Sequence, residues 1–265
     1  MALCTKTLSE HENPSLEALL SQGVIWQGSP TEAPPPWRAP LGASIPFGVP
    51  EIDSCLPLGG LACGAIHDLF ADDSGGLSAA PSAIPALLAR SAIASHYASP
   101  ASLWGRAHSG QLPFYIIWIG RQCWASPFSI PPQHLHACLF IDPPTEKLSL
   151  WAIETALRSP VAKLVIADAP RLSLTASRRF ALAAKNHNTT AILLRSSAKS
   201  HAPSAASTRW RLSPLASHTE SPAWEISLEK IKGASLAQSS WRIALEGGYG
   251  SGEDLSLRVL PGMVS

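Results

Sequence analysis

The sequence predicts an α/β fold, with a mostly parallel sheet, flanking helices and antiparallel strands added at its C-terminal edge. Two observations predict it. Between about 44 and 196, short apolar runs alternate with helical segments of about 10–15 residues, which is typical of parallel strands joined by crossover helices. Beyond Ser196, runs with alternation or β-branching are typical of antiparallel strands at a sheet edge.

The predicted elements of the parallel part follow one another in order. The run Phe114–Ile119 (FYIIWI) is continuous and apolar, as a strand buried on both faces should be. Leu150, Ile153 and Leu157 recur at helical spacing. The predicted strands are Ala65–Phe70, Phe114–Ile119, Ala137–Ile141, Lys163–Asp168 and Thr190–Leu194. The predicted helices are Ser82–Ala98, Ser149–Arg158 and Thr175–His187, the last capped by Ser173 or Thr175.

The ends of the chain differ from its middle. Residues 1–43 contain a proline-rich stretch and are predicted to form an N-terminal arm. Residues 44–246 form the predicted α/β domain, and residues 247–265 a flexible tail. The last strands of the predicted α/β domain are expected at Thr208–Ser213, Trp224–Leu228 and Trp241–Leu245.

Composition restricts the function classes. At 265 residues and 46% hydrophobic, the chain can bury a large core. We find no membrane-spanning run and no secretory signal, so we expect a cytoplasmic protein without membrane contact. The net charge of +1 makes no global case for nucleic-acid binding. Scattered cysteines, and His134 and His136 without a third ligand, predict no metal site, and we expect no cofactor.

Ala71–Ser78 follows the first predicted strand and has the length of a phosphate loop. A working loop, GxxxxGK[ST], needs glycines to turn N–H groups inward, a lysine for the phosphates and a hydroxyl for magnesium. Gly75, Gly76 and Ser78 are present, but Leu77 replaces the lysine. The segment is a candidate relic of a nucleotide site, although an ordinary glycine turn also explains it.

Asp168 ends the run KLVIAD, where a magnesium-organising acid would stand, and completes the candidate nucleotide relic. Acids end many strands, so a structural role stays open. The end of FYIIWI, Gly120–Gln122, offers no carboxylate to activate water. These residues predict a protein without catalytic residues.

Two arginine segments are candidates for partner or phosphate contacts. Arg178 and Arg179 are adjacent on a predicted helix, so at least one should be exposed. Arg209 and Arg211 flank Trp210 on a predicted strand, which places both guanidiniums on the face opposite the indole. Guanidinium binds phosphate or carboxylate well.

A structural explanation of the strand arginines stays open beside this one. Arg209 and Arg211 could equally form salt bridges to acids such as Glu225 or Glu229.

Several segments carry a family resemblance. Ile45–Asp53 and the glycines that follow resemble the opening of the RecA-type recombinase core. Ser173–Ala184 (with Ser-Arg-Arg) and Ala206–Trp210 (with Thr-Arg-Trp) are similar to the hallmark segments of the ImuA family. The similarity extends from Trp26 to Leu245 and includes the pattern Trp224, Leu228, Lys230, Lys232-Gly233 and Trp241, with lysines at 230 and 232 where the family commonly has arginine.

The resemblance implies a RecA-like fold with a degenerate phosphate loop. It implies a non-catalytic accessory protein of a damage-induced mutasome that supports translesion DNA synthesis. The implied partners are an ImuB-like relative of the Y-family polymerases and an error-prone replicative-type DNA polymerase, with RecA and DNA as further candidates. Two alternatives stay open: a RecA-type ATPase that uses Ser78 and Asp168, and a SulA-like cell-division inhibitor, which is normally much shorter.

Overall fold

The structure is a computed structural model of the chain. It describes residues 25–27, 44–71, 82–98, 114–125, 129–169, 171–196, 203–216, 221–233, 240–247 and 256–260. The helices in these ranges are α2 (Pro50–Asp53), α3 (Ala83–Ala98), α5 (Glu146–Arg158), α6 (Leu174–His187) and the 3₁₀ helix η2 (Pro132–Ala137). None of these helices has the length and apolar character needed to cross a membrane.

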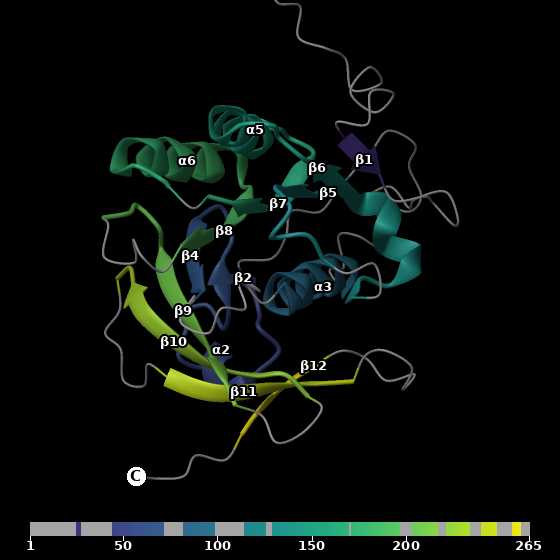
Figure 1. Cartoon of the computed structure of the whole chain (residues 1–265), viewed down its shortest axis with the longest axis vertical. Helices are drawn as coiled ribbons and strands as arrows, with labels where there is room; N and C mark the ends of the chain where they lie inside the picture. The colour runs from purple at the N-terminus through teal and green to yellow at the C-terminus, as the bar shows by residue number, and fades with distance from the viewer. Residues whose placement is uncertain are drawn as a thin grey trace, which may run out of the picture.

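Most of the described strands belong to one large sheet with the order β1-β6-β5-β7-β8-β4-β9-β10-β11-β12 (Figure 1). Its strands are β1 (Ile25–Gln27), β4 (Ile66–Ala71), β5 (Tyr115–Ile119), β6 (Cys138–Ile141), β7 (Ala162–Asp168), β8 (Thr190–Ser196), β9 (Thr208–Leu215), β10 (Ala223–Ile231), β11 (Ser240–Glu246) and β12 (Ser256–Val259). The strands from β6 to β9 run parallel, whereas β1 and β10 to β12 pair antiparallel with their neighbours. The short strands β2 (Ser44–Ile45) and β3 (Leu61–Ala62) form a separate antiparallel pair.

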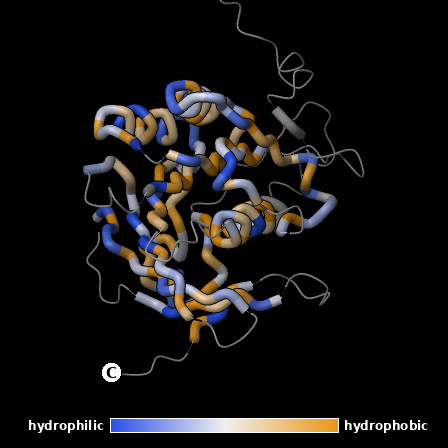
Figure 2. Tube along the Cα trace, in the orientation of Figure 1, coloured by the Kyte–Doolittle hydropathy of each residue, from blue (hydrophilic) through white to orange (hydrophobic). Residues whose placement is uncertain are grey.

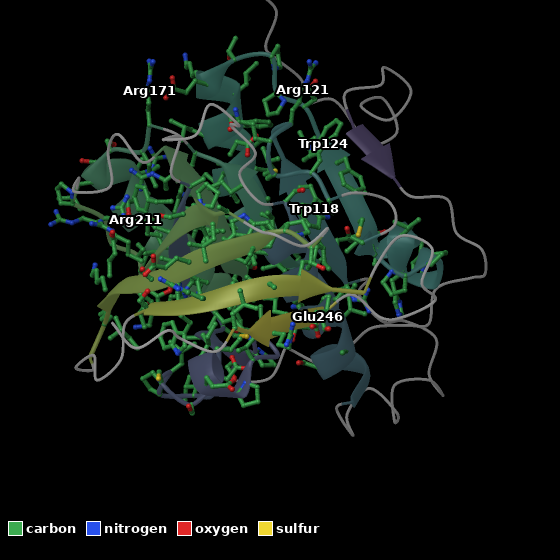
Figure 3. The ribbon with its side chains drawn as sticks, turned by 60° about the horizontal axis from the view of Figure 1, so that its bottom comes forward. Trp118, Arg121, Trp124, Arg171, Arg211 and Glu246 are labelled. Atoms are coloured by element: carbon green, nitrogen blue, oxygen red, sulfur yellow. The ribbon has the colours of Figure 1, made fainter. Side chains whose placement is uncertain are left out.

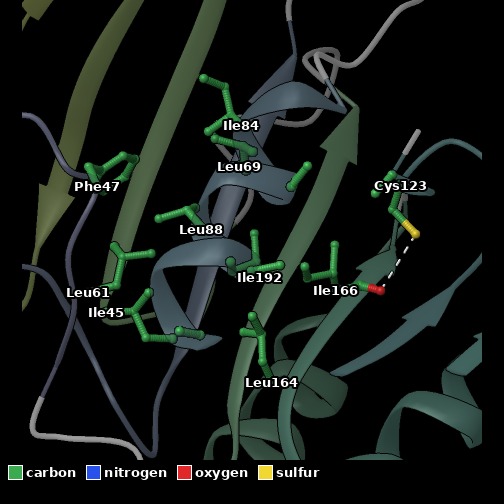
Figure 4. Close-up of a cluster of buried hydrophobic side chains, with 14 of the residues drawn as sticks. Ile45, Phe47, Leu61, Leu69, Ile84, Leu88, Cys123, Leu164, Ile166 and Ile192 are labelled. Carbon is green, nitrogen blue, oxygen red and sulfur yellow. Dashed lines mark hydrogen bonds between the residues drawn. The ribbon is translucent and has the colours of Figure 1, made fainter. Parts of the chain in front are cut away.

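Helices cover both faces of the parallel strands. Helices α5 and α6 lie side by side on one face, and α3 lies on the other, enclosed by the curved antiparallel strands (Figure 1). Hydrophobic segments gather between these layers (Figure 2). The larger core cluster joins α3 to Leu69, Leu164, Ile166 and Ile192 (Figure 4), and a second cluster lies under α5 and α6. Burial on both faces explains why the parallel strands are continuous apolar runs.

Local signals fix the ends of the two outer helices. The Thr145 hydroxyl accepts a hydrogen bond from the Leu148 N–H at 3.3 Å and starts α5. The Ser173 hydroxyl accepts one from the Ala176 N–H at 3.2 Å and starts α6, so Ser173 rather than Thr175 is the cap. Asn188, with φ of +52°, ends α6 in the left-handed conformation.

The structure confirms the mixed α/β class, with a large mostly parallel sheet flanked by helices, and corrects its edges. β9 was expected among the antiparallel strands, but it pairs parallel with β4 and only its other edge pairs antiparallel with β10. β1, within the predicted arm, extends the sheet beside β6. β12, within the predicted flexible tail, pairs with β11. Such pairings depend on distant partners, which alternation along one segment does not reveal.

Candidate functional site

The carboxyl ends of β5 and β7 form a topological switch point. After β5 the chain passes through Cys123, Ala125 and Ile130, which belong to the core on the α3 side, and continues to β6. After β7 it passes through α6 on the opposite face and continues to β8, on the other side. Adjacent parallel strands whose connections leave in opposite directions open a crevice, where α/β proteins bind ligands.

A pocket of about 740 Å³ lies at this switch point. Its wall comes from the ends of β5, β6 and β7 and from the first turn of α5. The polar and charged lining residues are Arg121, Gln122, Asp142, Thr145, Glu146, Ser149, Asp168 and Arg171. The size is that of a small-molecule site, and the lining is more charged than usual for one.

Asp168 forms one wall of this pocket and points toward the end of β5. Its Oδ2 accepts a hydrogen bond from the Gln122 N–H at 2.7 Å. Gly120, with φ of +98°, leaves the space for it, because a Cβ at position 120 would lie 2.4 Å from Oδ2. Oδ1 is buried without a hydrogen-bond partner in the described part of the chain. The connection after β5 therefore holds the carboxylate in place.

Burial raises the pKa of Asp168 to about 6, although the Gln122 N–H and the N–H and thiol of Cys123 act to lower it. Burial also raises the pKa of the Cys123 thiol well above its usual range, and the Asp168 carboxylate adds to this. The Cys123 Sγ lies 3.5 Å from the Ile166 carbonyl oxygen (Figure 4). The thiol therefore stays protonated and unreactive, while Asp168 can gain or lose a proton near neutral pH.

The rim of the pocket carries paired charges. The Arg121 guanidinium donates to Asp142 Oδ2 at 2.7 Å, and Arg171 lies 4.0 Å from Glu146. Both arginine side chains are mostly exposed, and both project at the same end of the molecule (Figure 3). No three metal-ligating side chains meet within the described ranges in a way that could hold a metal. The charged rim suits the binding of a small polar group.

The other residues of the candidate nucleotide relic, Gly75, Gly76 and Ser78, lie outside the described residues. β4, which leads into them, ends at Ala71, and β8 separates β4 from the strand that carries Asp168. Of the four residues of the candidate nucleotide relic, the structure describes Asp168 alone.

The segment Arg178–Arg179 lies on the exposed side of α6. Arg179 pairs with Glu154 of α5, which also pairs with Arg158 at 2.6 Å. Arg178 forms no ion pair with any residue that the structure describes. The prediction that at least one of the two arginines is exposed is confirmed.

The segment Arg209–Trp210–Arg211 lies on β9 with the predicted alternation. Trp210 is only 1% exposed, and it packs on Phe47 with ring centroids 4.8 Å apart. The Arg211 Nε donates to Glu229 Oε1 at 2.5 Å, as the salt-bridge alternative expected. The Arg209 guanidinium lies 5.4 Å from the centre of the Phe70 ring. These two arginines therefore contribute to the sheet itself.

Sequence reasoning missed a buried ion pair and the partner of Asp168. Asp68 on β4 and Arg195 on β8 form the pair, with N–O distance 3.3 Å and almost no exposure. The available signal was Asp68 inside the predicted strand Ala65–Phe70 and Arg195 directly after the predicted strand Thr190–Leu194. The contact of Gln122 with Asp168 had no local signal, because it depends on β5 pairing with β7.

No family model matches the chain, and no curated protein matches it. The geometry of the described residues is therefore the basis for interpreting the site.

Proposed function

We propose that this chain is a RecA-like, non-catalytic accessory protein of the ImuA kind, which supports translesion DNA synthesis by binding other proteins. The observation that carries the proposal is the exposed Arg178 on α6, within the segment most similar to the ImuA family and without an ion-pair partner among the described residues. An unpaired arginine on a helix surface can bind an acidic side chain or a phosphate.

The order of the parallel strands supports the RecA-like part of the proposal. β4, which precedes the candidate phosphate loop, lies in the sheet beside β8, and β8 lies beside the strand that ends in Asp168. This is the order in which a RecA-type core places its loop strand and its acid. The glycine-containing lead Ile45–Leu61 packs against the same core, with Ile45 and Leu61 fully buried.

The environment of Asp168 supports a role without nucleotide hydrolysis. Its carboxylate accepts a hydrogen bond from Gln122 and faces β5, and its raised pKa weakens it as a magnesium ligand. Leu77 also removes the lysine that would bind the phosphates.

The proposed partners are an ImuB-like polymerase relative and an error-prone replicative-type polymerase, with RecA and DNA as further candidates. The test is co-purification of the tagged full chain with the ImuB-like protein, beside an assay of ATP turnover. We expect stable co-purification and no turnover above background. ATP turnover that is lost in Ser78→Ala and in Asp168→Ala would establish the ATPase alternative instead.

A further inference from the structure

Helices α5 and α6 expose large apolar side chains. Leu148 and Trp151 of α5 are 43% and 54% exposed, and Leu182 of α6 is 61% exposed. Leu58, between α2 and β3, is the remaining large hydrophobic side chain that is exposed in the described ranges. A single exposed leucine is common on protein surfaces, but these two neighbouring helices together expose a tryptophan and two leucines.

The exposed apolar side chains lie on either side of a contact between the two helices. Trp151 lies one turn before Glu154 on α5, and Leu182 lies one turn after Arg179 on α6. The Glu154–Arg179 ion pair joins the helices between them. We call the surface formed by Leu148, Trp151, Arg178 and Leu182 the α5–α6 face; Figure 1 shows the two helices side by side on one face of the sheet.

The same two helices concentrate positive charge. They carry five lysines and arginines against two acids, a net charge of +3, whereas the whole chain has +1. Both acids already have cationic neighbours. Glu154 pairs with Arg158 and Arg179, and Glu146 lies near Arg171. Lys147, Arg178 and Lys185 form no ion pair with any described residue. The uncompensated charge is therefore positive and lies on the same two helices as the exposed apolar side chains.

We propose that the α5–α6 face binds a protein segment that presents apolar side chains flanked by acidic ones. The inference rests on the proposed function, for which it names the contact surface and the chemistry of the partner. Tryptophan and arginine are the residues that most often dominate protein–protein binding energy. The aliphatic side chains of Leu148 and Leu182 can pack against apolar side chains of a protein partner, whereas the charged backbone of a nucleic acid offers them no apolar contact.

The test measures binding of the ImuB-like protein to the full-length chain and to four variants. Trp151→Ala and Leu182→Ala remove the apolar anchors, and Arg178→Glu reverses an exposed charge that has no ion-pair partner among the described residues. Leu58→Ala is the matched control, because Leu58 is 53% exposed but lies elsewhere. All these side chains are exposed, so circular dichroism should show folded variants. We expect at least tenfold weaker binding for Trp151→Ala and Arg178→Glu, and unchanged binding for Leu58→Ala.

The outcomes separate this inference from the proposed function. If the wild-type chain does not bind the ImuB-like protein, the proposed function fails and the inference fails with it. If the wild type binds and the Trp151, Leu182 and Arg178 variants bind equally well, only the α5–α6 face is refuted. A parallel titration with fluorescent (dT)20 covers nucleic acid. Loss of DNA binding but not of protein binding in Trp151→Ala would reassign this face to single-stranded DNA.

Discussion

Asp168 and Gly120 depend on each other at the residue scale. The carboxylate occupies space that any side chain at position 120 would fill, and the backbone there has a φ of +98° that glycine adopts readily. The pocket wall therefore depends on a glycine whose importance is not evident from its own strand. Gly233 offers a comparison, since its φ is +82° but no described atom lies within 4 Å of its Cβ position.

We predict that Gly120→Ala destabilises the fold more than Gly233→Ala. Both variants force alanine into the left-handed region, at about 1–2 kcal/mol. Only Gly120→Ala also places a Cβ against the Asp168 carboxylate, which adds about 1–3 kcal/mol. Urea unfolding of both variants measures the difference. Equal losses would show that Asp168 moves away freely.

The raised pKa of Asp168 predicts a pH-dependent effect of Asp168→Asn. The folded-state pKa of about 6 exceeds the ordinary 3.8, so the folded chain binds the proton more tightly than the unfolded chain. Ionised Asp168 therefore lowers stability increasingly as the pH rises from about 4 to 6, by an amount on the order of 3 kcal/mol. Asparagine keeps an acceptor for the Gln122 N–H without the charge. We expect Asp168→Asn to raise the free energy of unfolding at pH 7.5.

The same comparison at pH 4.5 is the control. The stabilisation by Asp168→Asn should shrink there, because wild-type Asp168 is then protonated in the folded chain. Burial lowers the pKa of His67 to about 4, below its ordinary 6.5. His67 therefore makes the fold more stable as the pH rises from about 4 to 6.5, which is opposite to the effect of Asp168. His67 is present in both proteins, and its contribution cancels in the difference. A stabilisation that does not change with pH would contradict the raised pKa.

At the element scale, α6 presents the SRR segment, and its N-terminus is fixed by Ser173. Replacing Ser173 by alanine leaves the Ala176 N–H without its side-chain acceptor. We predict a loss of about 1 kcal/mol in the free energy of unfolding for Ser173→Ala. Thr175→Ala, an exposed site two residues later, should change it by less than about 0.5 kcal/mol. Thermal or urea unfolding compares the two variants. A larger loss for Thr175→Ala would show that Ser173 is not the residue that caps α6.

At the scale of the whole molecule, the sequence predicts the strands that are buried on both faces. It does not predict which strands lie next to each other in the sheet. Strands β5 and β7 appear as continuous apolar runs because helices cover both sides of them. β9 alternates whether its neighbour is parallel or antiparallel, so its pairing with β4 has no local signal. Asp168 was a candidate because it ends a strand. Its contact with Gln122 depends on the order of strands in the sheet, which no segment encodes alone.

Substitutions in the last strand, β12, can show where the folded domain ends. β12 pairs with β11 from Ile243 to Glu246, and Leu257 and Val259 pack against the larger core cluster. We predict that Leu257→Ala combined with Val259→Ala lowers the free energy of unfolding by about 2 kcal/mol, because both side chains are partly buried. Hydrogen exchange of the β11 amides should accelerate with it, since β12 covers that edge of the sheet.

Arg258→Ala is the matched control for β12, because the Arg258 side chain points away from the core and pairs only with Glu246 among the described residues. An exposed ion pair contributes at most about 1 kcal/mol, so this variant should stay close to wild type. If the double variant were also close to wild type, the packing of β12 would add nothing to stability, and the stable domain would end at β11, close to the predicted boundary at residue 246. A clear loss would instead extend the folded unit to Val259, with β12 protecting an edge that could otherwise pair with another chain.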